Sequence, residues 1–247
     1  MIVIKTDEEV EVMAKAGKIA GSCLSLLGSM VRPGITTREL DLAAEGFMRS
    51  CGAVPTFKGY GGFPASICTS INDVVVHGIP DDTRLVEGDI ISIDVGATLM
   101  EFVGDTAATF PVGKVSAQAR QLMDVTRDSL FAGISAAREG AHLGDVGAAV
   151  EGLVRKFGFS VVMDYAGHGV GHRMHEDPSV PNFGSWGVGP ALRRGMVLAI
   201  EPMVNVGRPE VISYPNMRVV TKDGSLSAHF EHTVAVTAAG PRCLTLV

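Results

Sequence analysis

The sequence lacks several features that would place it in a special class of protein. Its four cysteines show neither CxxC spacing nor the dense pattern of a disulfide-rich scaffold. Basic residues do not cluster and the formal net charge is -6, so nothing supports a DNA-binding surface. No apolar run reaches the ~18 residues of a membrane span, because Asp94 interrupts the best candidate. No signal peptide precedes the first helical pattern, and a cytoplasmic protein is expected.

What remains is the composition of an ordinary globular protein. The chain has 247 residues, of which 46% are hydrophobic and 19% charged, enough to bury a substantial core. Two segments, Thr6–Glu9 and Thr36–Glu39, fit the S/T-x-x-E capping box that begins a helix. Apolar residues recur at helical spacing after each box, and again over residues 116–138 and 143–157. Short apolar runs divided by Gly, Pro and Asn follow each pair of helices and predict strands.

The order helix, helix, strands occurs twice, and the two copies match residue by residue. At one constant offset, six identical residues of the first copy fall on six of the second: Arg32, Gly34, Glu45, Gly46, Arg49 and Gly52 on Arg138, Gly140, Glu151, Gly152, Arg155 and Gly158. A glycine, an apolar strand and an acid then follow in each copy, over 88–94 and 195–201. The repeat predicts one α+β domain of two related halves, roughly 1–113 and 114–247, with a site on a pseudo-two-fold axis.

Each half supplies two acids in strand contexts, Asp94 and Asp105 in the first and Glu201 and Glu231 in the second. An ionised carboxylate among apolar neighbours costs several kcal/mol to bury unless it is paired or binds metal. One such acid alone would be interpreted as a hydrogen-bonded structural group. Four of them on one axis repel unless roughly four positive charges lie between them, and two divalent ions supply that charge. The pattern favours Mn²⁺, Fe²⁺, Co²⁺ or Zn²⁺ and hydrolysis by a metal-bound hydroxide.

The segment AGHGVGHRMHEDPS, residues 166–179, contains three histidines. Its glycines argue against a helix, and the HExxH motif of helical zinc proteases is absent. His168, flanked by glycines that let the backbone approach closely, is interpreted as the metal ligand. His175 and His77 are candidate hydrogen-bonding groups around a substrate. His142, His172 and His229 are interpreted as structural or surface residues. His232, next to Glu231, is interpreted either as a group close to the ligands or as a packed residue.

With these residues in place, the chain resembles a type I methionine aminopeptidase of the short bacterial kind. The matching motifs span nearly the whole chain: GYGGFPASICTSINDVVVHGIP (59–80), GDIISIDVGA (88–97), GDTAATF (104–110), GHGVGHRMHEDPSVPNFG (167–184), LAIEPMV (198–204) and SLSAHFEHTVAVT (225–237). The resemblance implies the pita-bread fold, a central antiparallel sheet covered by helices. It also implies removal of the N-terminal methionine from peptides and nascent chains by a cytoplasmic monomer that works at the ribosome.

The resemblance assigns roles to individual residues. The ligands of a dinuclear metal centre would be Asp94, Asp105, His168, Glu201 and Glu231. Glu201 would also handle the proton of the attacking water, and His77 and His175 would bind the scissile amide. The methionine pocket would be lined by Tyr60, Phe63 and Cys68, together with Phe57, Met174 and Met217, which stand where familiar bacterial members carry other residues. A monovalent cation, found in some members, would be held at Asn72, Val74 and Ser227.

Two other functions fit parts of the sequence. An X-Pro aminopeptidase or prolidase shares the pita-bread fold but usually carries a sizeable additional N-terminal domain, whereas this chain begins almost directly at the first capping box. A pseudoenzyme that uses the fold to bind protein or RNA would typically lose metal ligands, and all five are present. Cleavage of Met-Ala-Ser, of X-Pro dipeptides or of neither separates the three functions.

Overall fold

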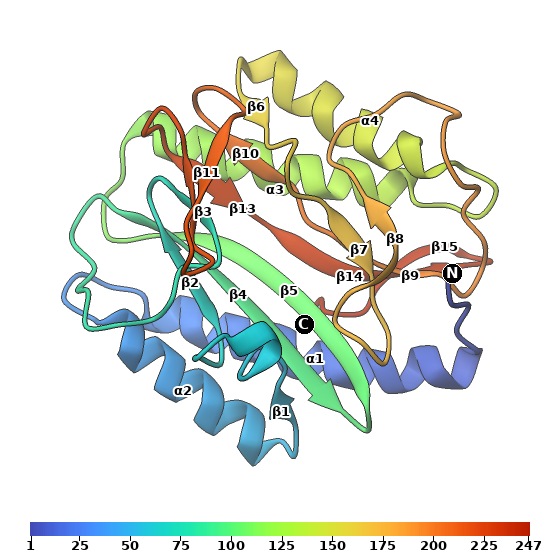
Figure 1. Cartoon of the computed structure of the whole chain (residues 1–247), viewed down its shortest axis with the longest axis horizontal. Helices are drawn as coiled ribbons and strands as arrows, with labels where there is room; N and C mark the ends of the chain where they lie inside the picture. Colours follow the sequence, from blue (N-terminus) through green and yellow to red (C-terminus); the bar gives the residue numbers. More distant parts are fainter.

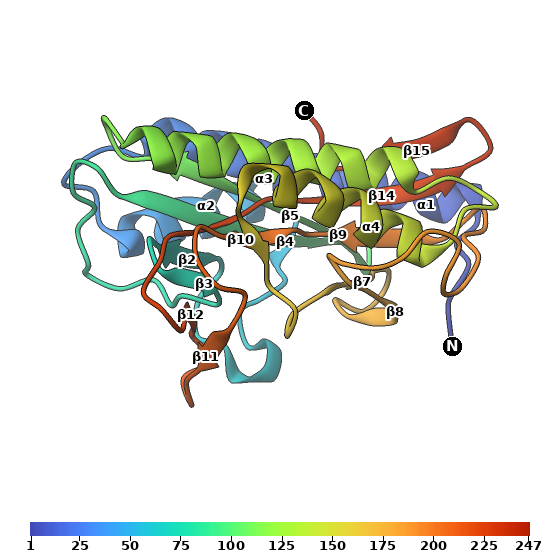
Figure 2. The same cartoon turned by 90° about the horizontal axis from the view of Figure 1, so that it is seen from above.

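Helices cover one side of a central antiparallel sheet, in a computed structural model that describes residues 1–247. The helices are α1 (Asp7–Met30), α2 (Thr37–Ser50), α3 (Ala117–Ala136) and α4 (Leu143–Val154), with single 3-10 turns η1 (Tyr60–Gly62) and η2 (Arg155–Phe157). α1 and α3 run along one side of the sheet (Figures 1 and 2). α2 packs on α1, and α4 packs on α3. None of these helices is both long and apolar enough to pass through a bilayer.

The main sheet has nine strands and joins both halves of the chain. The strands of the whole protein are β1 (Val54–Pro55), β2 (Cys68–Ile71), β3 (Val74–Val76), β4 (Ile90–Leu99), β5 (Phe102–Pro111), β6 (Ser160–Val161), β7 (Gly167–Gly169), β8 (Glu176–Val180), β9 (Val197–Ile200), β10 (Met203–Asn205), β11 (Val211–Ser213), β12 (Val219–Thr221), β13 (Ser227–His229), β14 (Glu231–Thr237) and β15 (Gly240–Cys243). The main sheet has the order β1-β4-β5-β14-β9-β7-β8, with β2 paired to β4 and β15 to β14. The late strand β14 therefore lies between β5 of the first half and β9 of the second.

Both predicted capping boxes form. The Thr6 hydroxyl accepts a hydrogen bond from the Glu9 N–H at 3.2 Å, while the Thr6 N–H donates to the Glu9 carboxylate at 2.7 Å. Thr36 and Glu39 make the same reciprocal pair at 3.1 and 2.8 Å. Each box satisfies N–H groups of a first turn that have no partner within the helix. The predicted starts of α1 and α2 are thus confirmed.

Structural features recur at the offset of the sequence repeat. At the start of α4, the His142 N–H donates to the Asp145 carboxylate at 2.8 Å, at the positions that match Thr36 and Glu39. Glycines with positive φ also occur in matched pairs: Gly34 and Gly140, Gly52 and Gly158, Gly88 and Gly195. Such backbone angles favour glycine because a side chain would be strained there. These matches support the proposal that 1–113 and 114–247 are related halves of one domain.

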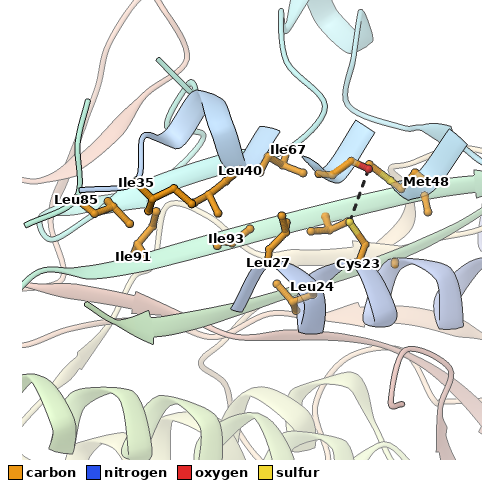
Figure 3. Close-up of a cluster of buried hydrophobic side chains, with 14 of the residues drawn as sticks. Cys23, Leu24, Leu27, Ile35, Leu40, Met48, Ile67, Leu85, Ile91 and Ile93 are labelled. Atoms are coloured by element: carbon orange, nitrogen blue, oxygen red, sulfur yellow. Dashed lines mark hydrogen bonds between the residues drawn. The ribbon is translucent and has the colours of Figure 1, made fainter. Parts of the chain in front are cut away.

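The core between α1, α2 and β4 fixes which face of the sheet is free to carry polar groups. Figure 3 shows its largest side chains, among them Leu27, Leu40 and Ile93. Ile91 and Ile93 of β4 are fully buried in this cluster. Because side chains alternate along a strand, the residue between Ile93 and Val95 points to the opposite face. That residue is Asp94.

Candidate active site

Five adjacent strands each bring one polar side chain to the face of the sheet away from the long helices. In sheet order they are Asp94 on β4, Asp105 on β5, Glu231 on β14, Glu201 directly after β9 and His168 on β7. Asp94 pairs with Ala107, and Ala107 pairs with Glu231. Directly opposed residues of antiparallel strands project from the same face, and so do residues two apart on one strand. Asp94, Asp105 and Glu231 consequently share one face.

The remaining two ligand candidates reach the same face through the other half of the sheet. His168 pairs with Ala199, and Ala199 pairs with Thr233. Thr233 lies two residues after Glu231, and Glu201 lies two residues after Ala199. All five side chains therefore converge, as the pairing of acids in the two halves predicts. The alanines between them leave the space over the strands open.

The four carboxyl groups are crowded and short of hydrogen-bond partners. Three oxygens are buried without any partner: Asp94 Oδ1, Asp105 Oδ1 and Glu231 Oε1. Burial and the neighbouring Asp105 carboxyl raise the pKa of Asp94 and of Glu231 well above their usual values. Burial and the charge of Glu201 raise the pKa of Asp105 to about 8, and burial raises the pKa of Glu201 to about 8. Without a counter-charge, this cluster resists ionisation.

His168 offers a free nitrogen to the same space. Its Nδ1 lies 2.9 Å from the Gly169 carbonyl oxygen, which can only accept, so Nδ1 carries the hydrogen and Nε2 has a free lone pair. Nε2 lies 3.8 Å from Asp105 Oδ2 and 3.6 Å from Glu201 Oε1. Burial lowers the pKa of His168 to about 4, which keeps the ring neutral. The fixed tautomer and the neutral ring are what metal binding through Nε2 requires.

This set of donors fits divalent metal. One ligand atom each of Asp105, His168 and Glu231 lie within 4.8 Å of one another. Four carboxylates and one imidazole form a hard, oxygen-rich set that suits divalent first-row ions. A bound cation would satisfy the partnerless oxygens and compensate the repulsion that raises the pKa values of the acids.

The metal-free protein is expected to lose stability as the pH rises from about 5 to about 8. In the unfolded chain the carboxyls of Asp105 and Glu201 ionise near 3.8 and 4.5, whereas in the folded chain they stay protonated up to a pKa of about 8. The native state binds more protons in this window, so the free energy of unfolding falls as protons are lost. Added Mn²⁺ should therefore raise the Tm more at pH 8 than at pH 6. Calorimetry of chelator-treated protein measures both effects, and an equal rise at the two pH values would contradict the assignment.

The ligand candidates form the floor of a cavity of about 730 Å³, measured with its open mouth. Fourteen residues line it: Gly61 and the thirteen residues to which the family resemblance assigns metal, amide or methionine binding. Phe57, Phe63, Cys68 and Met174 are buried and make an apolar wall. Tyr60 and Met217 are 47% and 40% exposed, at the mouth.

Two further histidines reach this cavity from loops. His175 stands just before β8, and its Nδ1 lies 2.8 Å from the Tyr60 hydroxyl. His77 follows β3 with φ 61°, and the edge of its ring faces Tyr165 at a centroid distance of 6.0 Å. Burial lowers the pKa of both histidines, so each is neutral at pH 7 and carries one N–H. The Tyr60 hydroxyl, as a donor to Nδ1, would place the hydrogen of His175 on Nε2.

Replacing Tyr60 by Phe tests this link between the mouth and His175. The variant keeps the ring but removes the partner of Nδ1, so the hydrogen on Nε2 is no longer fixed. Loss of one neutral hydrogen bond, roughly 0.5–1.5 kcal/mol, should lower kcat about 3- to 10-fold. KM for a methionyl peptide should change less than kcat. Steady-state kinetics measures the split, and an unchanged kcat would show that the hydroxyl does not orient His175.

The residues predicted to hold a monovalent cation lie outside the cavity. Asn72, Val74 and Ser227 are brought near one another by backbone contacts: the Ser227 N–H donates to the Asn72 carbonyl at 2.9 Å. The Asn72 side chain donates to Asp89 at 2.8 Å and accepts from the Ile90 N–H at 3.0 Å. A cation at this position stays a prediction.

The other histidines take the positions of structural groups, with one exception. His172 is exposed, with its ring 4.0 Å from that of Phe102, and His142 begins α4. His232 is packed, with Nδ1 2.8 Å from Thr245 Oγ1. The exception is His229, whose Nε2 lies 3.4 Å from Glu201 Oε2 and whose side chain is 2% exposed. The available signal was its closeness in the chain to a candidate ligand: His229 ends β13, and Glu231 begins β14 two residues later.

The chain is similar to known metallopeptidases over nearly its whole length. The family model of metallopeptidase family M24 matches residues 11–238. A methionine aminopeptidase from Clostridium acetobutylicum is 53% identical over 248 residues, with 100% of this chain and 99% of that protein covered. The crystal structure of methionine aminopeptidase from Rickettsia prowazekii matches with a TM-score of 0.98 at 43% identity, over 100% of both chains. A prolidase from Pyrococcus furiosus matches with a TM-score of 0.77 at 25% identity, over 99% of this chain and 66% of that one.

Proposed function

We propose that this chain, which belongs to metallopeptidase family M24 as a methionine aminopeptidase with the pita-bread fold, acts through a dinuclear metal centre. Its reaction would be removal of the N-terminal methionine from peptides and nascent chains. One observation carries the mechanism: the cluster of four acids and His168 forms the floor of the cavity whose wall is apolar. A substrate whose methionine side chain packs on the apolar wall would have its first peptide bond next to the four acids.

The wall suits an unbranched thioether. Phe57 and Phe63 present aromatic rings, and sulfur contacts with aromatic rings are favourable by about 0.3–1.5 kcal/mol. Met174 adds a flexible apolar side chain that can follow the shape of a ligand. Buried Cys68 fills the wall with a neutral thiol, because burial raises its pKa well above the usual value.

The reaction follows from the placement of the polar groups. The two ions would be held by Asp94, Asp105, His168, Glu201 and Glu231. When bound, they supply a Lewis acid for the substrate carbonyl and a water of lowered pKa. Glu201 takes the proton of the attacking water and passes it to the leaving amine. The N–H groups of His175 and His77 donate to the scissile amide and stabilise the charge that develops on its oxygen.

The test is metal-dependent release of methionine from Met-Ala-Ser. Chelator-treated protein is reloaded anaerobically with Mn²⁺, Fe²⁺, Co²⁺ or Zn²⁺ in turn, and free methionine is measured, with Glu201→Ala as the inactive control. Activity with at least one ion, absent in the control, is expected. Tight metal binding without cleavage of any methionyl peptide would overturn the proposed function, and cleavage of X-Pro dipeptides alone would identify a prolidase.

We further propose that a single copy of the chain acts on nascent chains in the cytoplasm, at the ribosome. Activity that is proportional to protein concentration down to the nanomolar range is the expected result.

A further inference from the structure

We propose that His229 is a positioning residue of the metal centre, whose Nε2–H donates a hydrogen bond to Oε2 of Glu201 and so turns Oε1 of that carboxylate toward the metal. The inference rests on the proposed function, because it requires an ion at the acid cluster. It concerns a residue that the sequence analysis interpreted as structural or surface.

The two oxygens of Glu201 face two different histidines. Oε1 lies 3.6 Å from Nε2 of His168, whose lone pair is free for a metal. Oε2 lies 3.4 Å from Nε2 of His229, on the other side of the carboxyl group. The carboxylate is thus divided into one oxygen beside a metal-binding nitrogen and one oxygen beside a second imidazole. Such outer hydrogen bonds orient the carboxylate ligands of metal sites.

His229 has no other use for this nitrogen. The side chain is 2% exposed, and Nε2 is buried without a hydrogen-bond partner. A buried polar atom left unpaired costs about 1–3 kcal/mol, so the atom is expected to have a partner in the working protein. The nearest carboxylate oxygen is Oε2 of Glu201, slightly beyond the usual hydrogen-bond length of about 2.7–3.2 Å. A small shift of Glu201 onto an ion would close the bond.

The backbone of His229 is held by hydrogen bonds on both sides, which fixes the point from which the ring projects. Thr109 Oγ1 donates to the His229 carbonyl at 2.9 Å and accepts from the His229 N–H at 2.9 Å. Ser92 Oγ lies 2.8 Å from the same Thr109 hydroxyl, on β4. β13 also pairs with β10, where His229 lies opposite Met203. Contacts with β5, β4 and β10 therefore hold the backbone from which the imidazole reaches Glu201.

The experiment compares two substitutions of the same residue. His229→Gln keeps an N–H donor that can reach Glu201, whereas His229→Leu keeps the volume and removes the donor. Calorimetric titration of chelator-treated protein with Mn²⁺ measures affinity, independently of catalysis. The Leu variant should bind Mn²⁺ about 10- to 100-fold more weakly than the wild type, in the range found when an outer hydrogen bond to a ligand is removed. The Gln variant should stay within roughly threefold of the wild type.

Unfolding curves of the metal-free variants show whether each variant is folded. If the Leu variant is not folded, His229→Asn replaces it, because the shorter side chain of Asn does not bring its amide to Glu201. Equal Mn²⁺ affinities in the wild type, the Gln variant and the Leu variant (or the Asn variant in its place) would overturn the inference. An equal loss of Mn²⁺ affinity in the Gln and Leu variants would overturn it too. Failure of the wild type itself to bind Mn²⁺, Fe²⁺, Co²⁺ or Zn²⁺ would overturn the proposed function instead.

Discussion

Replacement of Asp105 by Asn is expected to lower kcat/KM for Met-Ala-Ser by roughly three orders of magnitude, or about 4 kcal/mol of barrier. Asp105 is 2% exposed and stands on the central strand β5, between the strands of Asp94 and Glu231. An amide has a similar shape but no charge, and it replaces one of the two carboxylate oxygens by an N–H donor. The remaining three carboxylates would hold fewer or more weakly bound ions.

The same substitution should act in the opposite direction on stability. In the metal-free protein it removes one of the mutually repelling carboxyls, so at pH 8 the Asn variant should have a higher Tm than the wild type, by calorimetry. Asp128→Asn is the matched control, because Asp128 on α3 is exposed and pairs with Arg127. The control should keep full activity. Wild-type turnover in Asp105→Asn, at an unchanged metal content, would remove Asp105 from the ligand set.

Replacement of Lys5 by Met is expected to reduce the free energy of unfolding by about 3–5 kcal/mol. Lys5 Nζ lies 2.6 Å from Glu176 Oε2, and the two side chains are only 2% and 4% exposed. The pair ties the segment before α1 to β8, directly after His175. Removing the cation leaves Glu176 buried and charged without a counter-ion, which costs far more than the loss of an exposed pair.

Chemical denaturation measures this effect, and two further variants control for it. Arg38→Met breaks the exposed pair with Asp82, whose side chain is 81% exposed, and should cost less than about 1 kcal/mol. The double variant with Lys5→Met and Glu176→Gln should recover most of the stability, because the buried charge is gone while an acceptor for the Arg173 N–H remains. A single variant as stable as Arg38→Met would show that Lys5 does not neutralise Glu176.

The sequence was most informative where a local pattern determines the structure. The capping boxes at Thr6 and Thr36 form because a side chain and a backbone group three residues away settle each helix start. The paired acids are equally predictable, since a carboxyl inside an apolar strand requires a partner or a metal. The repeat then indicates that the acids meet, because related halves place related residues around one axis.

Contacts between distant segments could not be predicted in the same way. Nothing local in the sequence places the Tyr60 hydroxyl on Nδ1 of His175, because η1 and the segment before β8 meet only through the whole fold. His229 shows the same limit. It lies only two residues before Glu231, but its contact with Glu201 depends on how β13 and β10 pair.

The distribution of one candidate ligand to each of five adjacent strands has a consequence for shortened copies of the chain. β14 carries Glu231 and separates β5 from β9, yet it follows both of them in the sequence. A growing copy of the chain interrupted before residue 231 has neither that carboxylate nor the strand that joins its two halves. A copy interrupted there is therefore expected to be inactive, because β5 and β9 would lack the strand that joins them and brings their side chains together.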